Sequence, residues 1–392
     1  MATPALVFME DDTREQDIQV REEGKTPLAP HERPAFKEKI KVVGIGGGGN
    51  NALDHIIRSG ASNVEFLAIN TDAHCLENCL SVEKLVIGER LTKGHGAGAR
   101  PEIGEQAAIE SRENIRACLK GCDMVYLAAG MGGGTGTGAL PIIADIAKEM
   151  GILTVAVVTR PFNFEGKNRT TCSDAGIEKT KKIVDALIVV PNERLLLSDR
   201  STTVQEAFAM ADGVLRQAVQ GVIDLVTKPG FVNVDFADLR SIMKHSGGAV
   251  MGVGIGKGDN RAGDAMRRAM ESPLMESSIK GAKGVILNVT AGPDIGIFEV
   301  EEAAEHLKSQ IDPDANFIWG FVQDDKMGKD SQEEIQMVVI ATGFDMEGGA
   351  SRKEAQEYSS PNRQKAAPES DSFFSMDSPI DTPSYLRRRQ RQ

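Results

Sequence analysis

The chain has 392 residues and a formal charge of −12, with 45 Lys or Arg against 57 Asp or Glu. This length allows two domains with their own cores, and the acidic balance argues against broad, sequence-independent binding to nucleic acid. No apolar run reaches the roughly 18–20 residues of a membrane-spanning helix, and the first residues lack the basic and apolar regions of a secretory signal. We therefore expect a cytoplasmic protein without direct membrane insertion.

The five cysteines are typical of reduced thiols in such a protein. Two pairs have a four-residue spacing, Cys75 with Cys79 and Cys118 with Cys122, and His74 lies beside the first pair. Structural zinc sites usually have shorter spacings between their ligands. We therefore expect small buried thiols and not a zinc centre.

The first 38 residues are polar and rich in charge and proline, which predicts a disordered N-terminal arm over 1–38. Short β-branched apolar runs then alternate with helical patterns, such as 101–121, as far as residue 202. The runs are typical of buried parallel strands, which we expect at 40–46, 64–70, 83–89, 124–130, 152–159 and 186–192. This alternation predicts an α/β fold: a three-layer domain over 39–202 with a mostly parallel sheet and right-handed crossovers.

A long central helix is predicted over 203–228. Thr203 and Glu206 form a capping box at its start, and Lys228-Pro229-Gly230 ends it. Its apolar stripe consists of Val204, Phe208, Ala211, Leu215, Val219, Val222 and Val226. A helix of this length before a second α/β pattern is expected to stand between two domains.

The second pattern predicts a smaller α/β domain over 229–344 with a mixed sheet. We expect its strands at 249–256, 284–292, 317–323 and 334–344, and its helices at 260–272 and 298–311. The last two strands have no helix between them, which predicts that they pair antiparallel. Residues 345–375 lose all periodicity and are predicted to be a disordered linker before a C-terminal peptide, 376–392.

Two glycine-rich loops each follow a predicted strand and precede a predicted helix: VVGIGGGGNNA at 42–52 and GMGGGTGTG at 130–138. Glycine lets successive N–H groups turn towards one point and lets an oxyanion approach without meeting a Cβ. The following helix N-terminus then favours phosphate, and Thr135 and Thr137 add hydroxyl donors. A third segment, GHGAGARPE at 94–102, has the same small residues before a helix. Three such loops at successive strand ends predict a nucleoside triphosphate site.

The first loop alone allows another class of protein. Gly44, Gly46 and Gly49 fit G-x-G-x-x-G, and Asp72 ends the second strand where a ribose-binding acid would lie, which is typical of an NAD-dependent oxidoreductase. Glycines that serve only tight turns are the structural alternative, though a weak one for both loops together. The chain has no G-x-x-x-x-G-K-[ST] motif, so an ordinary P-loop nucleotidase is disfavoured.

The second loop, GMGGGTGTG, resembles the signature loop of the tubulin/FtsZ superfamily. Around it GGGGNNA, NTD, GAGA, PFNFEG, VPNERLL and NVDFAD resemble bacterial FtsZ in order and spacing, over about residues 40–344, and DTPSYLRRR is similar to that family's terminal peptide. The large C-terminal helical region of tubulins is missing. The resemblance implies a GTPase whose filaments form the cytokinetic ring in septation, at the mid-cell division site of a bacterium.

The resemblance also implies which residues bind GTP and GDP. The phosphates would be held by Gly47, Gly48, Gly49, Asn50, Asn51, Gly133, Gly134, Thr135, Gly136 and Thr137, with Ala97, Gly98 and Ala99 near the γ-phosphate. Glu165 and Arg169 match positions at the ribose and phosphates. Asn192 and Asp212 match those facing the guanine edge, and Phe208 the one lying against the base. From the residues alone, Phe208 fits a core position of the long helix equally well.

Guanine recognition by Asp212 has a physical basis. A carboxylate can accept hydrogen bonds from the N1–H and N2–H₂ groups of guanine, which adenine cannot supply. A site built on such bonds rejects the wrong base because its own polar groups would be left unpaired.

The residues expected to promote hydrolysis lie elsewhere, in NVDFAD: the amide Asn233 and the acids Asp235 and Asp238. Acids in a first helical turn are otherwise capping and dipole residues. In FtsZ-like proteins the matching acids reach the nucleotide of the neighbouring subunit, so the resemblance implies a head-to-tail homopolymer whose assembly stimulates hydrolysis. Asn70 and Asp72 are weaker candidates for water or Mg²⁺ contacts, with Mg²⁺ otherwise bound through GTP. Asp72 fits a helix cap equally well.

The terminal peptide implies partners, namely a membrane-tethering adaptor and division regulators. Without the resemblance it is a solvated basic tail. Thr382 and Tyr385 replace the family's isoleucine and phenylalanine, Arg100 stands where asparagine is usual, and Gly213 follows the base-reading acid. A nucleotide-binding scaffold that polymerises without turnover is a further alternative, whereas an oxidoreductase leaves GMGGGTGTG and NVDFAD unexplained.

Overall fold

The structure is a computed structural model that describes residues 38–61, 64–195, 203–227, 232, 234–244, 246–272, 275, 279–324, 327 and 334–343. These residues belong to one compact unit, Met1–Met346. Residues 1–37, Lys228-Pro229-Gly230, Asn233, the linker and the C-terminal peptide lie outside the described residues, so what was predicted for them stays a prediction. In the part of the chain described, no helix is long and apolar enough to cross a membrane.

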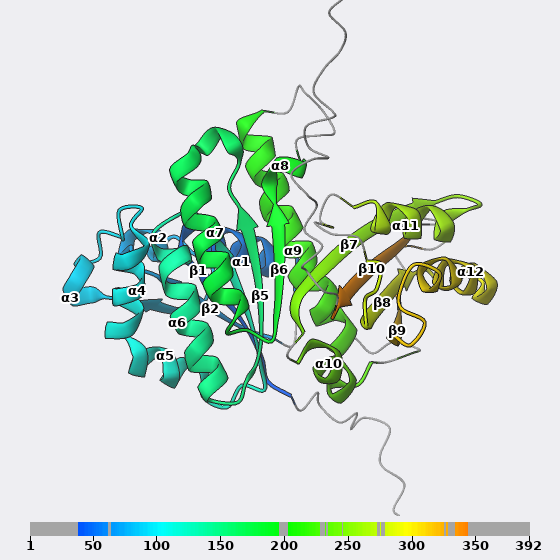
Figure 1. The fold of residues 1–392 in the computed structure, drawn as a ribbon, viewed down its shortest axis with the longest axis horizontal. Coiled ribbons are helices and arrows are strands. Elements are labelled where there is room, and N and C mark those ends of the chain that lie inside the picture. Colours follow the sequence, from blue (N-terminus) through cyan, green and yellow to red (C-terminus); the bar gives the residue numbers. More distant parts are fainter. Residues whose placement is uncertain are drawn as a thin grey trace, which may run out of the picture. The chain divides into compact units, whose positions relative to one another are not determined.

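Ten strands form one sheet in the order β3-β2-β1-β4-β5-β6-β7-β10-β8-β9 (Figure 1). The strands are β1 (Ile40–Ile45), β2 (Glu65–Asn70), β3 (Glu83–Val86), β4 (Met124–Gly130), β5 (Leu153–Arg160), β6 (Ala186–Pro191), β7 (Gly247–Lys257), β8 (Gly284–Ala291), β9 (Asn316–Gln323) and β10 (Glu334–Thr342). Strands β1 to β6 are all parallel, and β10 runs antiparallel to both of its neighbours. The predicted α/β class with a mostly parallel sheet is confirmed.

Helices cover both faces of this sheet. They are α1 (Gly46–Arg58), α2 (Ala73–Glu77), α3 (Glu89–Thr92), α4 (Pro101–Glu110), α5 (Arg112–Leu119), α6 (Thr135–Glu149), α7 (Lys167–Lys181), α8 (Asn192–Leu195), α9 (Val204–Thr227), α10 (Phe236–Met243), α11 (Arg261–Met270) and α12 (Ile297–Lys308), with a short 3₁₀ turn η1 (Asn163–Glu165).

Alternate residues of the buried parallel strands belong to two separate hydrophobic cores, one on each face of the sheet. Val42 and Tyr126 face one side, where α1, α9 and α10 cover the sheet, and Val43 and Leu127 face the other, where α4, α5, α6 and α7 do so. This period of two follows from the pleat of a strand. A third core under α11 and α12 completes the C-terminal half of the sheet.

The predicted pairing of the last two strands is wrong. Strand β10 inserts between β7 and β8, and β9 pairs with β8 in parallel on the outer edge. Strand β8 therefore lies between β9 and β10 in the sheet. The two halves of the sheet are joined by a short parallel contact in which Ala186 to Ile188 pair with Gly247 to Ala249.

Local helix predictions need smaller corrections. The helical pattern over 101–121 is two helices, α4 and α5, separated at Ser111. Helix α6 begins at Thr135, within the second glycine loop, so this loop is partly helical and does not simply precede a helix.

The predicted capping box of α9 is present: Thr203 N–H donates to Glu206 Oε2 over 2.8 Å, and Glu206 N–H donates to Thr203 Oγ1 over 3.2 Å. The apolar stripe of α9 is only partly core. Ala211, Leu215, Val219 and Val222 are buried, whereas Val204 is 66% exposed and Phe208 is 41% exposed.

The cysteines are free, and of the predicted buried thiols Cys79 alone is buried. Cys79 is buried and its thiol donates to Asp54 Oδ1 over 2.9 Å. Cys118 and Cys122 are half-buried, but Cys75 is exposed on α2. Helix α2 ends at Glu77, so the predicted pair of thiols on one helix does not form there.

Candidate functional site

A pocket of about 460 Å³ opens where β1, β4, β5 and β6 end at their carboxyl edges. Ligands of open α/β sheets bind at this edge. The pocket is lined by Ile45, Gly46, Gly47, Gly48, Asn51, Gly130, Met131, Gly133, Gly134, Thr135, Gly136, Thr159, Pro161, Glu165, Arg169, Asn192, Phe208, Ala211 and Asp212.

The two glycine loops form one wall of this pocket, and their glycines do two different things. A Cβ on Gly49 would lie 2.2 Å from the carbonyl oxygen of Ala128, so this glycine lets α1 pack directly on β4. A Cβ on Gly47 or Gly133 would meet no atom within 4 Å. These two positions line open space, where backbone N–H groups at the starts of α1 and α6 can meet an anion.

The third loop supports the second from behind. None of Ala97, Gly98 and Ala99 lines the pocket, but a Cβ on Gly134 would come within 2.8 Å of Ala97 Cβ. Ala99 has a φ of +59°, a left-handed conformation that is unusual for alanine. The predicted γ-phosphate contact of this loop stays a prediction.

Glu165 and Arg169 form an ion pair at the rim, from Nη1 of the arginine to Oε2 of the carboxylate. The other carboxylate oxygen, Oε1, accepts the Phe162 N–H over 2.9 Å. Glu165 is thereby held in place at the end of η1, and Arg169 lines the pocket beside it. A fork of donors at this position suits phosphate or ribose oxygens.

The opposite end of the pocket is aromatic and polar. Phe208 packs edge-on against Phe162, with ring centroids 5.3 Å apart and an interplanar angle of 84°. Asn192 is 5% exposed, and its Oδ1 has no hydrogen-bond partner within the described residues. Burial raises the pKa of Asp212, and the nearby His55 opposes this effect. A buried amide oxygen and a half-buried carboxylate are groups that a polar planar ligand would satisfy.

Several predicted site residues do not line the pocket: Gly49, Asn50, Asn70, Asp72 and Thr137. Asn70 Oδ1 accepts the Thr71 N–H over 2.9 Å. Asp72 caps α2 by accepting the Cys75 N–H over 3.1 Å, and this bond lowers the pKa of Asp72. The capping interpretation of Asp72 is therefore the one that the geometry supports.

The other two predicted residues are also turned away from the pocket. Thr137 Oγ1 accepts the Gly132 N–H over 2.8 Å. Asn50 is buried behind the loop, and its amide atoms have no partner among the described residues. Conversely, sequence reasoning missed Thr159, Pro161 and Ala211. Ala211 could have been found as the neighbour of Asp212, and the other two lie at the end of β5.

The predicted catalytic acids lie outside the pocket. Asp235 and Asp238 are exposed at the start of α10. Asp235 occupies the N-cap position, but its side chain accepts no capping hydrogen bond. Asn233 lies outside the described residues. The structure therefore shows no side-chain hydrogen bond by which Asp235 would cap α10.

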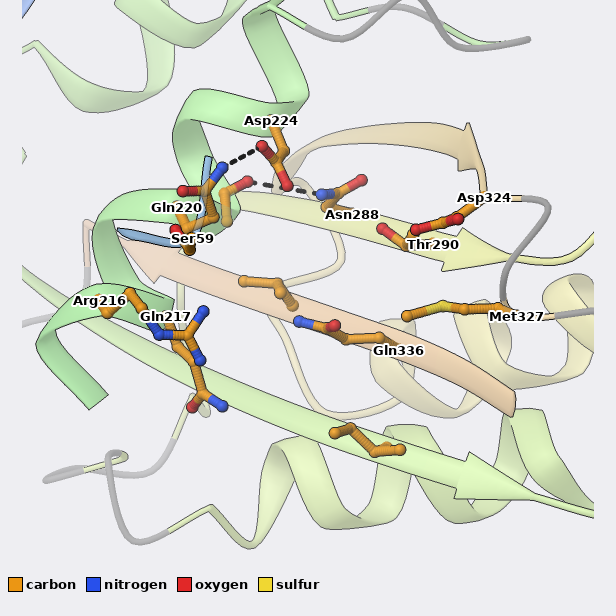
Figure 2. A pocket seen from close by; sticks show the side chains of 13 residues that line it. Ser59, Arg216, Gln217, Gln220, Asp224, Asn288, Thr290, Asp324, Met327 and Gln336 are labelled. Carbon is orange, nitrogen blue, oxygen red and sulfur yellow. Dashed lines mark hydrogen bonds between the residues drawn. The ribbon is translucent and has the colours of Figure 1, made fainter. Parts of the chain in front are cut away.

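A second pocket of about 320 Å³, which the sequence did not predict, lies between α9 and strands β8 and β10 (Figure 2). Gln220 Nε2 donates to Asp224 Oδ1 there, and Asn288 Nδ2 donates to the Gly221 carbonyl oxygen over 3.4 Å (Figure 2). None of the predicted site residues lines it. The first pocket is therefore the candidate nucleotide site.

Comparison with known proteins agrees with this geometry. The GTPase domain of the tubulin/FtsZ family matches residues 39–198, and the C-terminal domain of the FtsZ family matches residues 247–345. An FtsZ dimer structure from M. jannaschii is 41% identical with a TM-score of 0.75, over 78% of this chain and 88% of that chain.

Two structures from Haloferax volcanii share the fold alone. The GDP-bound CetZ1 monomer is 20% identical with a TM-score of 0.69, over 81% of this chain and 98% of that chain. The CetZ2 protofilament with GTPγS is 19% identical with a TM-score of 0.66, over 81% of this chain and 98% of that chain. These likenesses do not favour an NAD-dependent oxidoreductase. Because two domain matches and 41% identity over most of both chains coincide with a pocket between two glycine loops, the chain belongs to the tubulin/FtsZ family of GTPases.

Proposed function

We propose that this chain binds GTP in the pocket between its glycine loops and hydrolyses it only at a junction between two copies. The copies assemble head to tail into filaments of the bacterial division ring at mid-cell. One observation carries the proposal: the acids Asp235 and Asp238 are exposed and do not line the pocket in which the two glycine loops would hold the phosphates. A second copy is the simplest way to bring them together.

Binding rests on the backbone. The N–H groups around Gly47, Gly48, Gly133 and Gly134 surround the space where phosphates fit, and α1 and α6 both begin at this space. Phosphates are stabilised there by the partial positive charge of each helix N-terminus. Arg169 adds a full positive charge at the rim.

Base selection rests on the other end of the pocket. The carboxylate of Asp212 accepts hydrogen bonds from the guanine N1–H and N2–H₂ groups. The buried side-chain amide of Asn192 forms a hydrogen bond with the base, and Phe208 lies against the ring. Adenine would leave both polar side chains without partners, which costs binding free energy.

Hydrolysis needs a positioned water and an acceptor for its proton. In the lining of the pocket, Glu165 is paired with Arg169 and Asp212 is at the base end. We assign the positioning of this water to Asp235 and Asp238 of the next copy, and we include Asn233 in the same catalytic group. A contact in which one face meets a different face builds a filament when it does not close into a ring. The dimer of M. jannaschii FtsZ and the CetZ2 protofilament are assemblies of those proteins that support this arrangement.

A protein-held Mg²⁺ site does not fit the described residues. No group of three or more His, Cys, Asp or Glu side chains among them could hold a metal ion. Asn70 and Asp72 use their oxygens on nearby backbone amides. In this proposal Mg²⁺ accompanies the phosphates of GTP, and no step depends on a protein ligand to it.

The proposed division of the chain follows the same logic. Residues 39–202 bind GTP, 203–228 form the central helix and 229–344 carry the hydrolytic acids. The peptide 376–392 binds a membrane-tethering adaptor and division regulators at the end of the linker 345–375. This last part rests on the sequence alone.

The Asp238→Ala variant tests the mechanism. GTP binding and filament formation should survive, because neither uses this carboxylate, whereas phosphate release should fall by roughly 100-fold or more. Light scattering and phosphate release measure the two properties in one sample. Asp314→Ala, which removes another exposed aspartate, is the matched control and should behave as the parent.

Other outcomes identify other functions. If Asp238→Ala releases phosphate at the parent rate, the proposed role of this acid is wrong. Parent protein that scatters light with GTP but releases no phosphate is a scaffold without turnover. Binding of NADH with no response to GTP would indicate the oxidoreductase.

A further inference from the structure

We propose that Thr71 is a positioning residue for phosphate binding: its buried hydroxyl donates to the Thr135 hydroxyl and so leaves the hydrogen of Thr135 for a phosphate oxygen. This inference rests on the proposed function in one respect, that the pocket holds a phosphorylated nucleotide, whatever its base. Thr71 directly follows β2 and does not itself line the pocket.

The geometry places one buried hydroxyl behind one that lines the pocket. Thr71 Oγ1 lies 2.7 Å from Thr135 Oγ1, a typical distance for a hydrogen bond between two hydroxyl groups. Thr135 is the first residue of α6 and lines the pocket. Thr71 is fully buried. The buried residue therefore acts on a bound nucleotide only through its neighbour.

Thr135 is the threonine that the second glycine loop gives to the pocket. The other threonine of this loop, Thr137, does not line the pocket, and its Oγ1 accepts the Gly132 N–H over 2.8 Å. The way in which the Thr135 hydroxyl is oriented therefore matters for the side-chain contribution of this loop to phosphate binding.

The chemistry of a phosphate fixes the direction of the hydrogen bond between the two threonines. From the geometry alone, either oxygen could be the donor. A hydroxyl group has one hydrogen to donate, and an ionised phosphate oxygen only accepts. When Thr135 gives its hydrogen to phosphate, the hydrogen between the two threonines has to come from Thr71. A hydroxyl that accepts one hydrogen bond is also a better donor of the next.

Thr71 is well held for this task by its backbone. Its N–H donates to Asn70 Oδ1 over 2.9 Å. Its carbonyl oxygen accepts the Thr92 hydroxyl over 3.2 Å and the Gly96 N–H over 3.1 Å. Thr71 thereby joins the third loop to the second glycine loop, and its hydroxyl reaches Thr135 from a backbone that is already ordered.

The test measures GDP affinity by calorimetry for the full-length parent, Thr71→Val and Thr71→Ser. Valine has the shape of threonine without the hydroxyl, so Thr71→Val should bind GDP roughly three- to tenfold more weakly, as expected for one hydrogen bond. Serine keeps the hydroxyl, so Thr71→Ser should bind within about twofold of the parent. Thr154→Val is the matched control and should follow the parent. It removes a buried hydroxyl that donates to the Ile152 carbonyl oxygen over 3.0 Å, at the end of β5 away from the pocket.

A double-mutant cycle isolates the contact between the two hydroxyls. Thr135→Val should itself weaken GDP binding, because it removes the donor to phosphate. In the Thr135→Val background, Thr71→Val should cause less than about a twofold further loss, because the acceptor of its hydrogen is gone. If Thr71→Val weakens binding by the same factor in both backgrounds, Thr71 is merely structural and the inference is overturned.

The remaining outcomes are equally decisive. Equal GDP affinity of the parent and Thr71→Val overturns the inference, as does a Thr71→Ser variant that binds as weakly as Thr71→Val. If chemical denaturation shows that Thr71→Val does not fold, Thr71→Cys takes its place with the same expectation, because a thiol is a weak donor. A parent that binds ADP as tightly as GDP overturns the proposed guanine selection but not this inference, whose variants then lose ADP affinity by the same factor. A parent that binds neither nucleotide overturns both.

Discussion

At the scale of single residues, the base end of the pocket carries the specificity. Asn192 is buried and its Oδ1 has no hydrogen-bond partner in the described structure, whereas Asp212, from a different element, is half-buried with 20% of its side chain exposed. Burial without a partner destabilises a folded chain, so such a pair is expected where a ligand supplies the missing bonds. The phosphate end, in contrast, is built almost entirely from backbone and would accept any nucleotide.

Asp212→Asn should change the base that the pocket selects. An asparagine amide accepts the N1–H with its oxygen but offers its NH₂ to position 2, where guanine has an amino group and xanthine a carbonyl. We expect GDP affinity to fall by roughly 100-fold and XDP to become the preferred ligand. Competition between GDP and XDP at about pH 8 measures this change. A variant that still prefers GDP would show that Asp212 does not face the base.

The predicted site residues that do not line the pocket share one physical cause. Asp72 and Thr137 are polar residues beside a glycine loop or a strand end, as the lining residues Asn51 and Thr135 are. Such a side chain can either turn to a ligand or bond to the local backbone, depending on which backbone groups lie within its reach. Spacing in a sequence does not encode that choice, so the resemblance placed both kinds in the site.

At the scale of elements, the contact between α4 and α6 positions the loops behind the phosphates. A Cβ on Gly138 of α6 would lie 1.9 Å from the Pro101 carbonyl oxygen, and a Cβ on Gly104 of α4 would lie 2.3 Å from that of Gly134. The two helices thus approach backbone to backbone. This approach sets the loop at 97–99 directly against the second glycine loop.

Gly138→Ala should separate these helices and destabilise the protein. The added methyl group has no room, so we expect the free energy of unfolding to fall by about 1–3 kcal/mol, together with weaker GDP binding. Gly213→Ala is the matched control, because its Cβ would meet no atom within 4 Å and α9 is helical there. That variant should stabilise the protein by about 0.5–1 kcal/mol. Chemical denaturation measures both, and equal effects of the two substitutions would contradict the packing argument.

The elements themselves were predictable, but their long-range order was only partly so. All ten strands coincide with predicted apolar runs. Strands such as β1 and β6 are buried on both faces and are therefore apolar over nearly their whole length. The position of β10 between β7 and β8 was missed. The length of a connection limits which strands can pair but does not choose among the possible neighbours. The absence of a helix between the last two strands therefore did not show that they pair with each other.

At the scale of the whole molecule, the proposal makes activity a property of the assembly. A site divided between two copies has no complete set of groups in a monomer, so phosphate release per molecule should rise with protein concentration and vanish on strong dilution. Loss of the γ-phosphate removes charge and contacts at the same junction, so hydrolysis should weaken the contact that promoted it. Both properties follow because Asp235 and Asp238 do not belong to the pocket between the glycine loops.

Mixing two inactive variants tests the divided site most directly. Asp238→Ala binds GTP but lacks the acid, and Asp212→Asn keeps the acid but rejects GTP. In an equimolar random filament, roughly one junction in four joins a GTP-bearing Asp238→Ala copy to the intact acid of an Asp212→Asn copy. Phosphate release from the mixture should therefore clearly exceed the sum of the separate rates. If the mixture gives only that sum, each copy hydrolyses its own nucleotide, because complementation is possible only when the reacting groups come from different chains.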